Sequence, residues 1–194
     1  MEIGATKAVQ DRLKTTKIEE SKGASLVFCW DTHLTKIKGR NVLFIVNASN
    51  RYTIAMTDIE PRNWNYYTMY ISRVIHGVMQ EMGYSEDQIG QYFKMSGDTI
   101  VTKTHGRKSV GGINRMVMDA QYFGKKLEKE AKYQWELSEY LNRDICQPEG
   151  FDAYGYPSEL FKLDMERLGI AAKRKPAKII GFTKYIDTNR STNH

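Results

Sequence analysis

The stretch LVFCWDTHLTKIKGRNVLFIVNASNRYTIAMT, residues 26–57, decides the fold of this chain. Its β-branched and aromatic residues fall into short runs, which the polar sequences KGR at 38–40 and NASNR at 47–51 separate as turns. The run VLFIV at 42–46 is apolar throughout, which predicts a central strand covered on both faces. The pattern predicts a short antiparallel meander with strands over residues 26–30, 34–38, 42–46 and 52–57.

Helical patterns precede and follow the meander in the sequence. Apolar residues recur at three- and four-residue spacing between Pro61 and Met82, which predicts one helix there. Ser85 and Gln88 form a capping-box pattern at the start of the next helix. Further elements are expected as helices over residues 6–13, 85–95, 112–141 and 158–168 and a returning strand over 99–102.

Together these elements predict an α+β fold in which the meander packs against several helices and one long helix follows a basic strand-to-helix loop. Residues 1–145 are expected to form the core domain. Residues 146–194 are expected to form a C-terminal helix and basic tail that packs on the core or extends from it. A helix over 112–141 would be about 45 Å long, so its second half should project or pack on a partner, as in a homodimer.

Composition narrows the class of protein. Hydrophobic residues make up 41% of the 194 residues, enough for a real core. No apolar run approaches the roughly 20 residues of a transmembrane helix, and the first residues are charged where a secretory signal is apolar. Cys29 and Cys146 are too few for a disulfide framework or a zinc site. We therefore expect a cytoplasmic protein without membrane contact, cofactor or metal.

Positive charge gathers in two places. Net charge is +6, and residues 171–194 hold six Lys or Arg against one Asp, which is 6 − 1 = +5. Between Asp98 and Asp119 there is no acidic residue. Such clusters attract nucleic acid or an acidic protein surface, although surface lysines also serve solubility alone. The candidate tail residues are Lys173, Arg174, Lys175 and Lys178.

The segment KTHGRKSVGGIN at 103–114 carries the other cluster. Glycines that enter a helix let the backbone approach a ligand, and the first helical amides point outward unsatisfied. The segment therefore suits a phosphate or carboxylate, unless it is only a tight strand-to-helix turn. Its candidate nucleic-acid or anion-binding residues are Lys103, His105, Arg107, Lys108, Gly111, Gly112, Asn114 and Arg115.

Aromatic residues could also bind a partner, by stacking on bases or anchoring a protein interface. Trp64 and Tyr67 fit the apolar stripe of their helix and are expected to be buried. The better interface candidates are Tyr66, Tyr70, Tyr133 and Trp135.

The pattern KTxxRxxxGxxN at 103–114, with Trp30 and VLF at 42–44 ahead of it, resembles an uncharacterised bacterial domain of unknown function. The resemblance covers residues 6–123 and implies a short N-terminal helix, a tryptophan-led meander and a helical middle. It brings no known activity. The sequence departs from the family pattern at Lys108, where serine is typical, and at Asp31, where histidine is usual.

In size, basic charge and lack of Walker, dinucleotide-binding or zinc-protease motifs, the chain also resembles small anti-CRISPR proteins of phages, plasmids and other mobile elements. That likeness implies a non-enzymatic inhibitor that binds a nucleoprotein, namely type II Cas9 or its guide RNA, in the cytoplasm of a bacterial host cell. An effector complex exposes both a basic channel and its RNA backbone.

Two alternatives stay open. A metal-independent ribonuclease could use His105 and His33 as acid and base, with Lys103 or Arg107 stabilising the phosphorane. A DNA-binding regulator could use the helix at 112–141, although that helix is too acidic after Leu127 to lie in a major groove.

Overall fold

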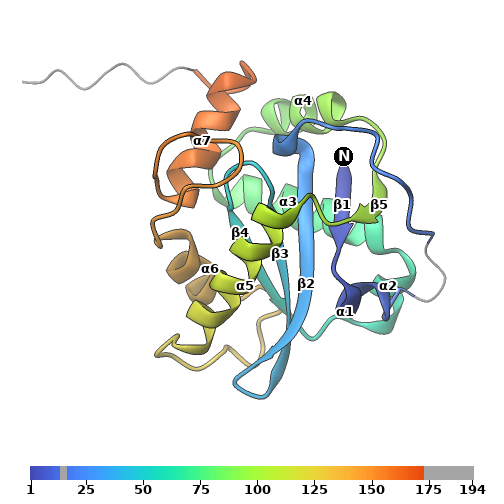
Figure 1. The fold of residues 1–194 in the computed structure, drawn as a ribbon, viewed down its shortest axis with the longest axis vertical. Coiled ribbons are helices and arrows are strands. Elements are labelled where there is room, and N and C mark those ends of the chain that lie inside the picture. Colours follow the sequence, from blue (N-terminus) through green and yellow to red (C-terminus); the bar gives the residue numbers. More distant parts are fainter. Residues whose placement is uncertain (14–16, 173–194) are drawn as a thin grey trace, which may run out of the picture.

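A computed structural model of the chain describes residues 1–13 and 17–172. Its centre is a mixed five-stranded sheet with the order β4-β3-β2-β1-β5 (Figure 1). The strands β2, β3 and β4 pair antiparallel as a meander, while β1 lies between β2 and β5 and is parallel to both. The strands are β1 (Glu2–Ala5), β2 (Cys29–Ile37), β3 (Arg40–Asn47), β4 (Thr53–Thr57) and β5 (Ile100–Lys103). The predicted α+β class and its antiparallel meander are confirmed, but the meander has three strands instead of four. The two strands predicted at 26–30 and 34–38 are one strand, β2, and Leu26–Phe28 form a 3-10 turn before it.

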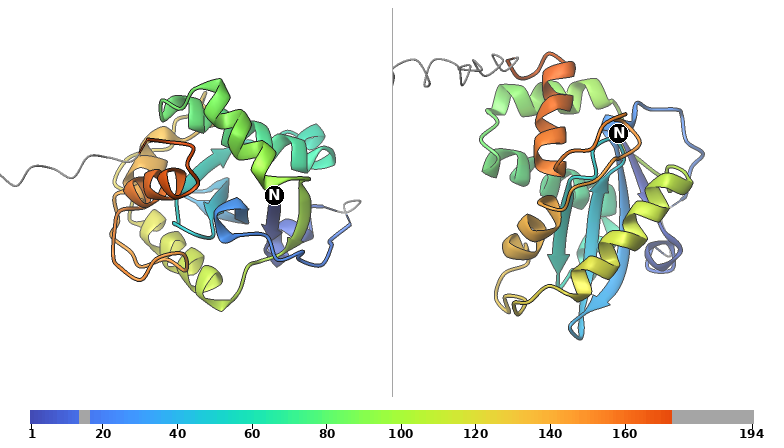
Figure 2. Two further views of the ribbon diagram at one scale, coloured as in Figure 1. Left: turned by 90° about the horizontal axis from the view of Figure 1, so that it is seen from above. Right: turned by 60° about the vertical axis from the view of Figure 1, so that its left-hand side comes forward.

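Two helical layers cover the sheet, which lies between them when seen from above (Figure 2, left). A first core joins Leu43 and Ile45 of β3 to α3, α4 and α7, and a second core joins Val42 and Phe44 to α5 and α6. All four of these β3 side chains are fully buried, so the strand is covered on both faces as expected. The helices are α1 (Lys7–Gln10), η1 (Leu26–Phe28, a 3-10 turn), α2 (Pro61–Asn65), α3 (Tyr67–Glu81), α4 (Glu86–Ser96), α5 (Arg107–Gln121), α6 (Trp135–Asn142) and α7 (Pro157–Arg167).

The strand β1 was not predicted, and it positions the site. In its register, Glu2 lies beside Cys29 of β2 and Ile100 of β5, and Gly4 lies beside Asp31. Because successive side chains of a strand point to opposite faces, Glu2 and Gly4 share one face of the sheet.

The long helix predicted over residues 112–141 is wrong. The helix α5 ends at Gln121, and α6 begins only at Trp135. Phe123 and Leu127 of the intervening segment are buried in the second core. The same segment covers the edge strand, where the Thr57 amide donates to the Lys132 carbonyl over 2.8 Å. The segment stabilises the protein more by covering the exposed edge of the sheet than it would by continuing the helix. The predicted projecting half of the helix is therefore absent from the described residues, and it no longer supports the expected homodimer.

The other predicted boundaries need smaller corrections. The helix expected over 61–82 is broken at Tyr66, whose φ of −115° and ψ of 45° separate α2 from α3. The first helix is only α1 rather than residues 6–13. The Ser85–Gln88 capping box is confirmed, with both of its hydrogen bonds present.

The C-terminal part that the structure describes contacts the rest of the fold through α7. Phe161 and Met165 of this helix are buried in the first core. The division into residues 1–145 and 146–194 stays a prediction, and the tail candidates Lys173, Arg174, Lys175 and Lys178 lie outside the described residues. Within the described residues, no helix is both long and apolar enough to cross a membrane.

Candidate nucleic-acid interface

The junction between β5 and α5 is shorter than the predicted glycine-rich loop. Gly106 precedes the helix with a φ of 96°, a left-handed conformation that favours glycine. Because α5 begins at Arg107, Gly111 and Gly112 lie inside the helix instead of at its entrance. The expectation that these two glycines form a ligand-binding loop is therefore wrong.

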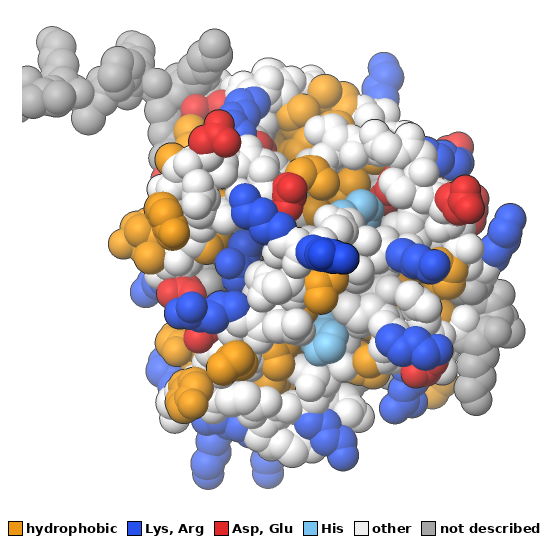
Figure 3. All heavy atoms as spheres, in the orientation of Figure 1, with side chains coloured by type: hydrophobic (Ala, Val, Ile, Leu, Met, Phe, Trp, Pro, Cys, Tyr) orange, Lys and Arg blue, Asp and Glu red, His pale blue; other side chains and the backbone are white. Residues whose placement is uncertain are grey.

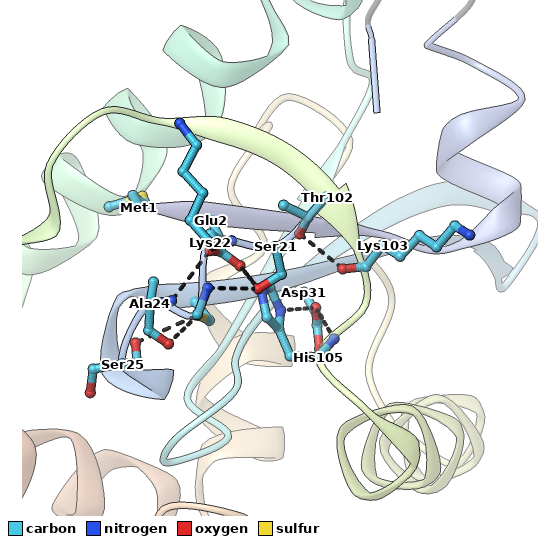
Figure 4. Close-up of polar contacts among 12 residues, drawn as sticks. Met1, Glu2, Ser21, Lys22, Ala24, Ser25, Asp31, Thr102, Lys103 and His105 are labelled. Atoms are coloured by element: carbon cyan, nitrogen blue, oxygen red, sulfur yellow. Dashed lines mark hydrogen bonds and ion pairs between the residues drawn. The ribbon is translucent and has the colours of Figure 1, made fainter. Parts of the chain in front are cut away.

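A buried ionic cluster fixes this junction to the sheet (Figure 4). His105 Nδ1 lies 2.7 Å from Asp31 Oδ1, and His105 Nε2 lies 3.1 Å from Glu2 Oε2. The three side chains are only 7%, 0% and 3% exposed, in the order His105, Asp31 and Glu2. We call Glu2, Asp31 and His105 the ionic cluster.

Asp31 also holds the amino end of α5. Its carboxylate accepts the His105 backbone amide at 3.2 Å and the hydroxyl of Ser109. A carboxylate near a helix N-terminus is favourable because the helix dipole is positive there. The protein's own Asp31 thus lies where an external anion was expected, so any ligand must use the outer surface of α5.

The ionic cluster is a charged imidazolium between two carboxylates. Burial alone would lower the pKa of His105, but hydrogen bonds to Asp31 and Cys29 and the charge of Asp31 raise this pKa to about 10. Burial opposes ionisation of Glu2, yet hydrogen bonds from Ser21 and His105 keep its pKa below the usual value. Both ring nitrogens of His105 are therefore engaged with carboxylates.

The second histidine of the ribonuclease alternative, His33, contacts a different group. Its Nδ1 lies 3.2 Å from Thr6 Oγ1, and burial lowers the pKa of His33. Among the described residues no hydrogen bond or ion pair joins His33 to His105. This arrangement offers the ribonuclease alternative no support.

The exposed side of α5 borders a pocket of about 250 Å³, which we call the basic pocket. Arg51 Nη2 donates to the Gly112 carbonyl at 2.8 Å, and Lys108 Nζ donates to the Pro148 carbonyl at 3.3 Å. Carbonyl oxygens hold these two cations in place without cancelling their charge. The lining residues are Val46, Ala48, Arg51, Lys108, Ser109, Gly111, Gly112, Arg115, Gln147, Pro148 and Glu149.

Arg107 extends this surface at the start of α5. Lys103 and Arg107 are exposed, and neither side chain forms an ion pair with a described residue. Arg115 is exposed, and its Nε lies 3.5 Å from Oδ2 of Asp119. Figure 3 shows Lys and Arg side chains over the face that α5 crosses. We call Arg51, Arg107, Lys108 and Arg115 the basic face; Asn114 is exposed beside them. Lys103 is not part of it, because its partner in register, Ala5, belongs to the first core on the sheet face opposite to α5.

The aromatic interface candidates separate into two groups. Tyr66 and Trp135 are 65% and 45% exposed. Tyr70 and Tyr133 are half-buried and pack against the first core, so they offer a partner less surface. Tyr67 is buried as expected, whereas Trp64 is only half-buried and stacks on Tyr67.

Sequence reasoning missed Glu2, Gly4, Asp31, Arg51 and Ser109. Ser109 lies within the quoted segment at 103–114, but its partner Asp31 does not. The others lie outside that segment, and the contacts of Asp31 and Glu2 with His105 span 74 and 103 residues.

The two neighbouring glycines of α5 offer a test of the Arg51 position. A Cβ at Gly112 would lie 3.1 Å from Arg51 Nε, whereas a Cβ at Gly111 would meet nothing within 4 Å. We expect Gly111→Ala to raise the free energy of unfolding by about 0.5–1 kcal/mol through helix propensity. The Gly112→Ala variant should gain less stability than Gly111→Ala, or lose stability, because its new Cβ displaces the Arg51 side chain. Equal gains in chemical denaturation would contradict the position of Arg51 against α5.

A family model described as a domain of unknown function (DUF6933) matches residues 2–160, which is most of the chain. Neither the curated proteins nor the solved structures contain a match.

Proposed function

The chain belongs to the DUF6933 family of domains of unknown function, and for this member we propose a non-enzymatic protein that binds a nucleoprotein through nucleic-acid phosphates. One observation carries the proposal: the basic face gathers four cations along α5, and the exposed Arg107 among them has no ion pair with a described residue. The match to the family model confirms the expected membership of an uncharacterised domain family. The function is our proposal.

The chemistry of the face favours phosphate. The carboxylates that share a pocket or an ion pair with these cations are Glu149, Asp119 and Asp144. Four cations against these three carboxylates leave 4 − 3 = +1 on this surface. Arginine and lysine contacts to phosphate provide most sequence-independent affinity for nucleic acid.

We propose type II Cas9 with its guide RNA as the nucleoprotein to test first, with this protein as its inhibitor. An RNA-guided effector holds its nucleic acid mainly through the backbone, so a second basic protein can compete for exposed guide RNA. The expected character of an anti-CRISPR protein motivates this choice, and the basic face supplies the means of binding.

The test compares two double charge reversals. Arg107→Glu/Lys108→Glu changes the basic face, and Arg73→Glu/Lys94→Glu makes the same change in net charge on α3 and α4, which cover the other face of the sheet. We expect the first variant to bind fluorescently labelled guide RNA at least about tenfold more weakly, because two phosphate contacts become repulsive. The matched control should stay close to wild type in fluorescence anisotropy. Equal losses of RNA affinity in both variants would show that the effect depends only on net charge and not on the basic face.

A second arm separates the partner and the chemistry. Cas9 loaded with guide RNA should lose DNA cleavage when wild-type protein is added, and Arg107→Glu/Lys108→Glu should restore it. RNA bound to the protein should remain intact. RNA cleavage by the wild-type protein would instead support the ribonuclease, and binding to RNA without inhibition of Cas9 would retain the phosphate interface but reject this partner.

A further inference from the structure

We infer that Glu2, Cys29 and His105 form a site for a divalent transition metal of the zinc type, with Asp31 as the residue that positions His105. The inference is independent of the proposed RNA binding. One ligand atom from each of the three residues lies within 4.8 Å of the others. They come from β1, from the start of β2 and from the junction after β5, so the sheet itself assembles the group. Figure 4 shows Glu2 and His105 of this group.

The donor set suits zinc. A thiolate sulfur, an imidazole nitrogen and a carboxylate oxygen are the ligand types that bind Zn²⁺ in proteins. Glu2, Cys29 and His105 are nearly inaccessible to solvent, as side chains at structural metal sites are. A fourth position would be taken by water or another group, as at zinc sites with three protein ligands.

Asp31 supplies an independent observation that points to a metal. Its carboxylate contacts Nδ1 of His105 at 2.7 Å, which leaves Nε2 directed at Glu2 over 3.1 Å. Metal-binding histidines usually donate their other ring N–H to a carboxylate, which fixes the ring and makes it a better ligand. Gly4 makes room for this contact, since a Cβ there would lie 1.8 Å from Asp31 Oδ1.

The exchange of protons for metal conserves charge. Without metal, the carboxylates of Glu2 and Asp31 and the imidazolium of His105 sum to −1, with Cys29 as a neutral thiol. Binding of a divalent ion releases one proton from His105 Nε2 and one from Cys29 Sγ. The ion adds a charge of +2. The imidazolium becomes neutral and the thiol becomes a thiolate, and each change removes one positive unit, so the sum stays at −1. Metal binding therefore creates no additional buried charge. An uncompensated buried charge is the usual obstacle to placing an ion in a protein interior.

The test uses Co²⁺ as a spectroscopic substitute for Zn²⁺, added to protein freed of metal by a chelator. We expect one equivalent of Co²⁺ to give visible d–d bands and a thiolate-to-cobalt charge-transfer band, and Zn²⁺ to displace it. Cys29→Ser should abolish the charge-transfer band. Cys146→Ser is the matched control, because Cys146 is also buried but lies with Phe151 and Leu160 in a separate cluster, and it should leave the band unchanged.

A second variant covers the case in which Cys29→Ser does not fold. Asp31→Asn keeps the ligands but weakens the support of His105, and we expect the affinity for Co²⁺ to fall about 10–100-fold with the charge-transfer band retained at saturation. The inference is overturned if wild type shows no thiolate-to-cobalt band, or if Cys146→Ser removes it. Either result would leave the group as a hydrogen-bonded ion pair only.

Discussion

Replacement of His105 by alanine is expected to lower the free energy of unfolding by about 3–5 kcal/mol, the usual cost of removing one partner from a buried ion pair. The change leaves the carboxylates of Glu2 and Asp31 buried without the cation that contacts both. It also releases the amino end of α5 from its attachment to the sheet. The measurement is urea unfolding at neutral pH in the presence of a chelator, so that bound metal does not contribute.

His76 provides the matched control. It also faces a carboxylate, Glu86, with 3.1 Å between His76 Nε2 and Glu86 Oε2, but the side chains are 38% and 67% exposed. Exposed ion pairs contribute less than about 1 kcal/mol, so His76→Ala should have a small effect. Similar losses from the two substitutions would show that the ionic cluster is not the attachment of α5 that we describe.

The effect of His105 should also depend on pH in a defined direction. The pKa of His105 is raised to about 10 in the folded protein from an ordinary value of 6.5. The stabilisation is therefore fully present below pH 6.5 and is lost as pH rises toward 10. The difference in unfolding free energy between wild type and His105→Ala should shrink across this window. A difference that stays constant from pH 6 to 10 would argue against a charged His105.

Gly4→Ala carries the second large effect. The added Cβ would lie 1.8 Å from Asp31 Oδ1 and 3.0 Å from His105 Nδ1, and both side chains are packed in the ionic cluster. One must move and lose a charged hydrogen bond, so we expect a loss of about 2–4 kcal/mol. The same chemical denaturation experiment measures it.

Gly90→Ala is the corresponding control. Gly90 is exposed within α4, and a Cβ there would meet nothing within 4 Å. Because alanine is the better helix former, this variant should be about 0.5–1 kcal/mol more stable than wild type. A Gly4→Ala protein as stable as wild type would contradict the close approach of β1 to Asp31.

Local patterns were sufficient for the parts of the fold that depend on neighbouring residues. The apolar run of β3 and the capping box at Ser85 are readable from a few positions, and both are confirmed. The strand β1 was not readable, because it contains Glu2 and Gly4 and gains its stability from parallel pairing with distant strands. The end of α5 was missed since helical periodicity continued through Leu127, whereas pairing with β4 decided the structure.

The candidate site divides in the same way. Lys103, Arg107, Lys108 and Arg115 are close in sequence, so their shared charge was visible without a structure. Arg51 joins them only through its contact with Gly112, and the ionic cluster depends on the order of three strands. His105 was grouped with the exposed cations because sequence does not report burial, and the structure moves it to the buried cluster.

The salt dependence of RNA binding tests the proposed role of the basic face most directly. Each phosphate contact contributes about 0.7–0.9 to the slope of log affinity against log salt concentration. We expect Arg107→Glu/Lys108→Glu to lower the magnitude of that slope by about 1–2 relative to wild type, while Arg73→Glu/Lys94→Glu leaves it nearly unchanged. An identical slope for wild type and Arg107→Glu/Lys108→Glu would contradict the claim that the basic face binds nucleic-acid phosphates.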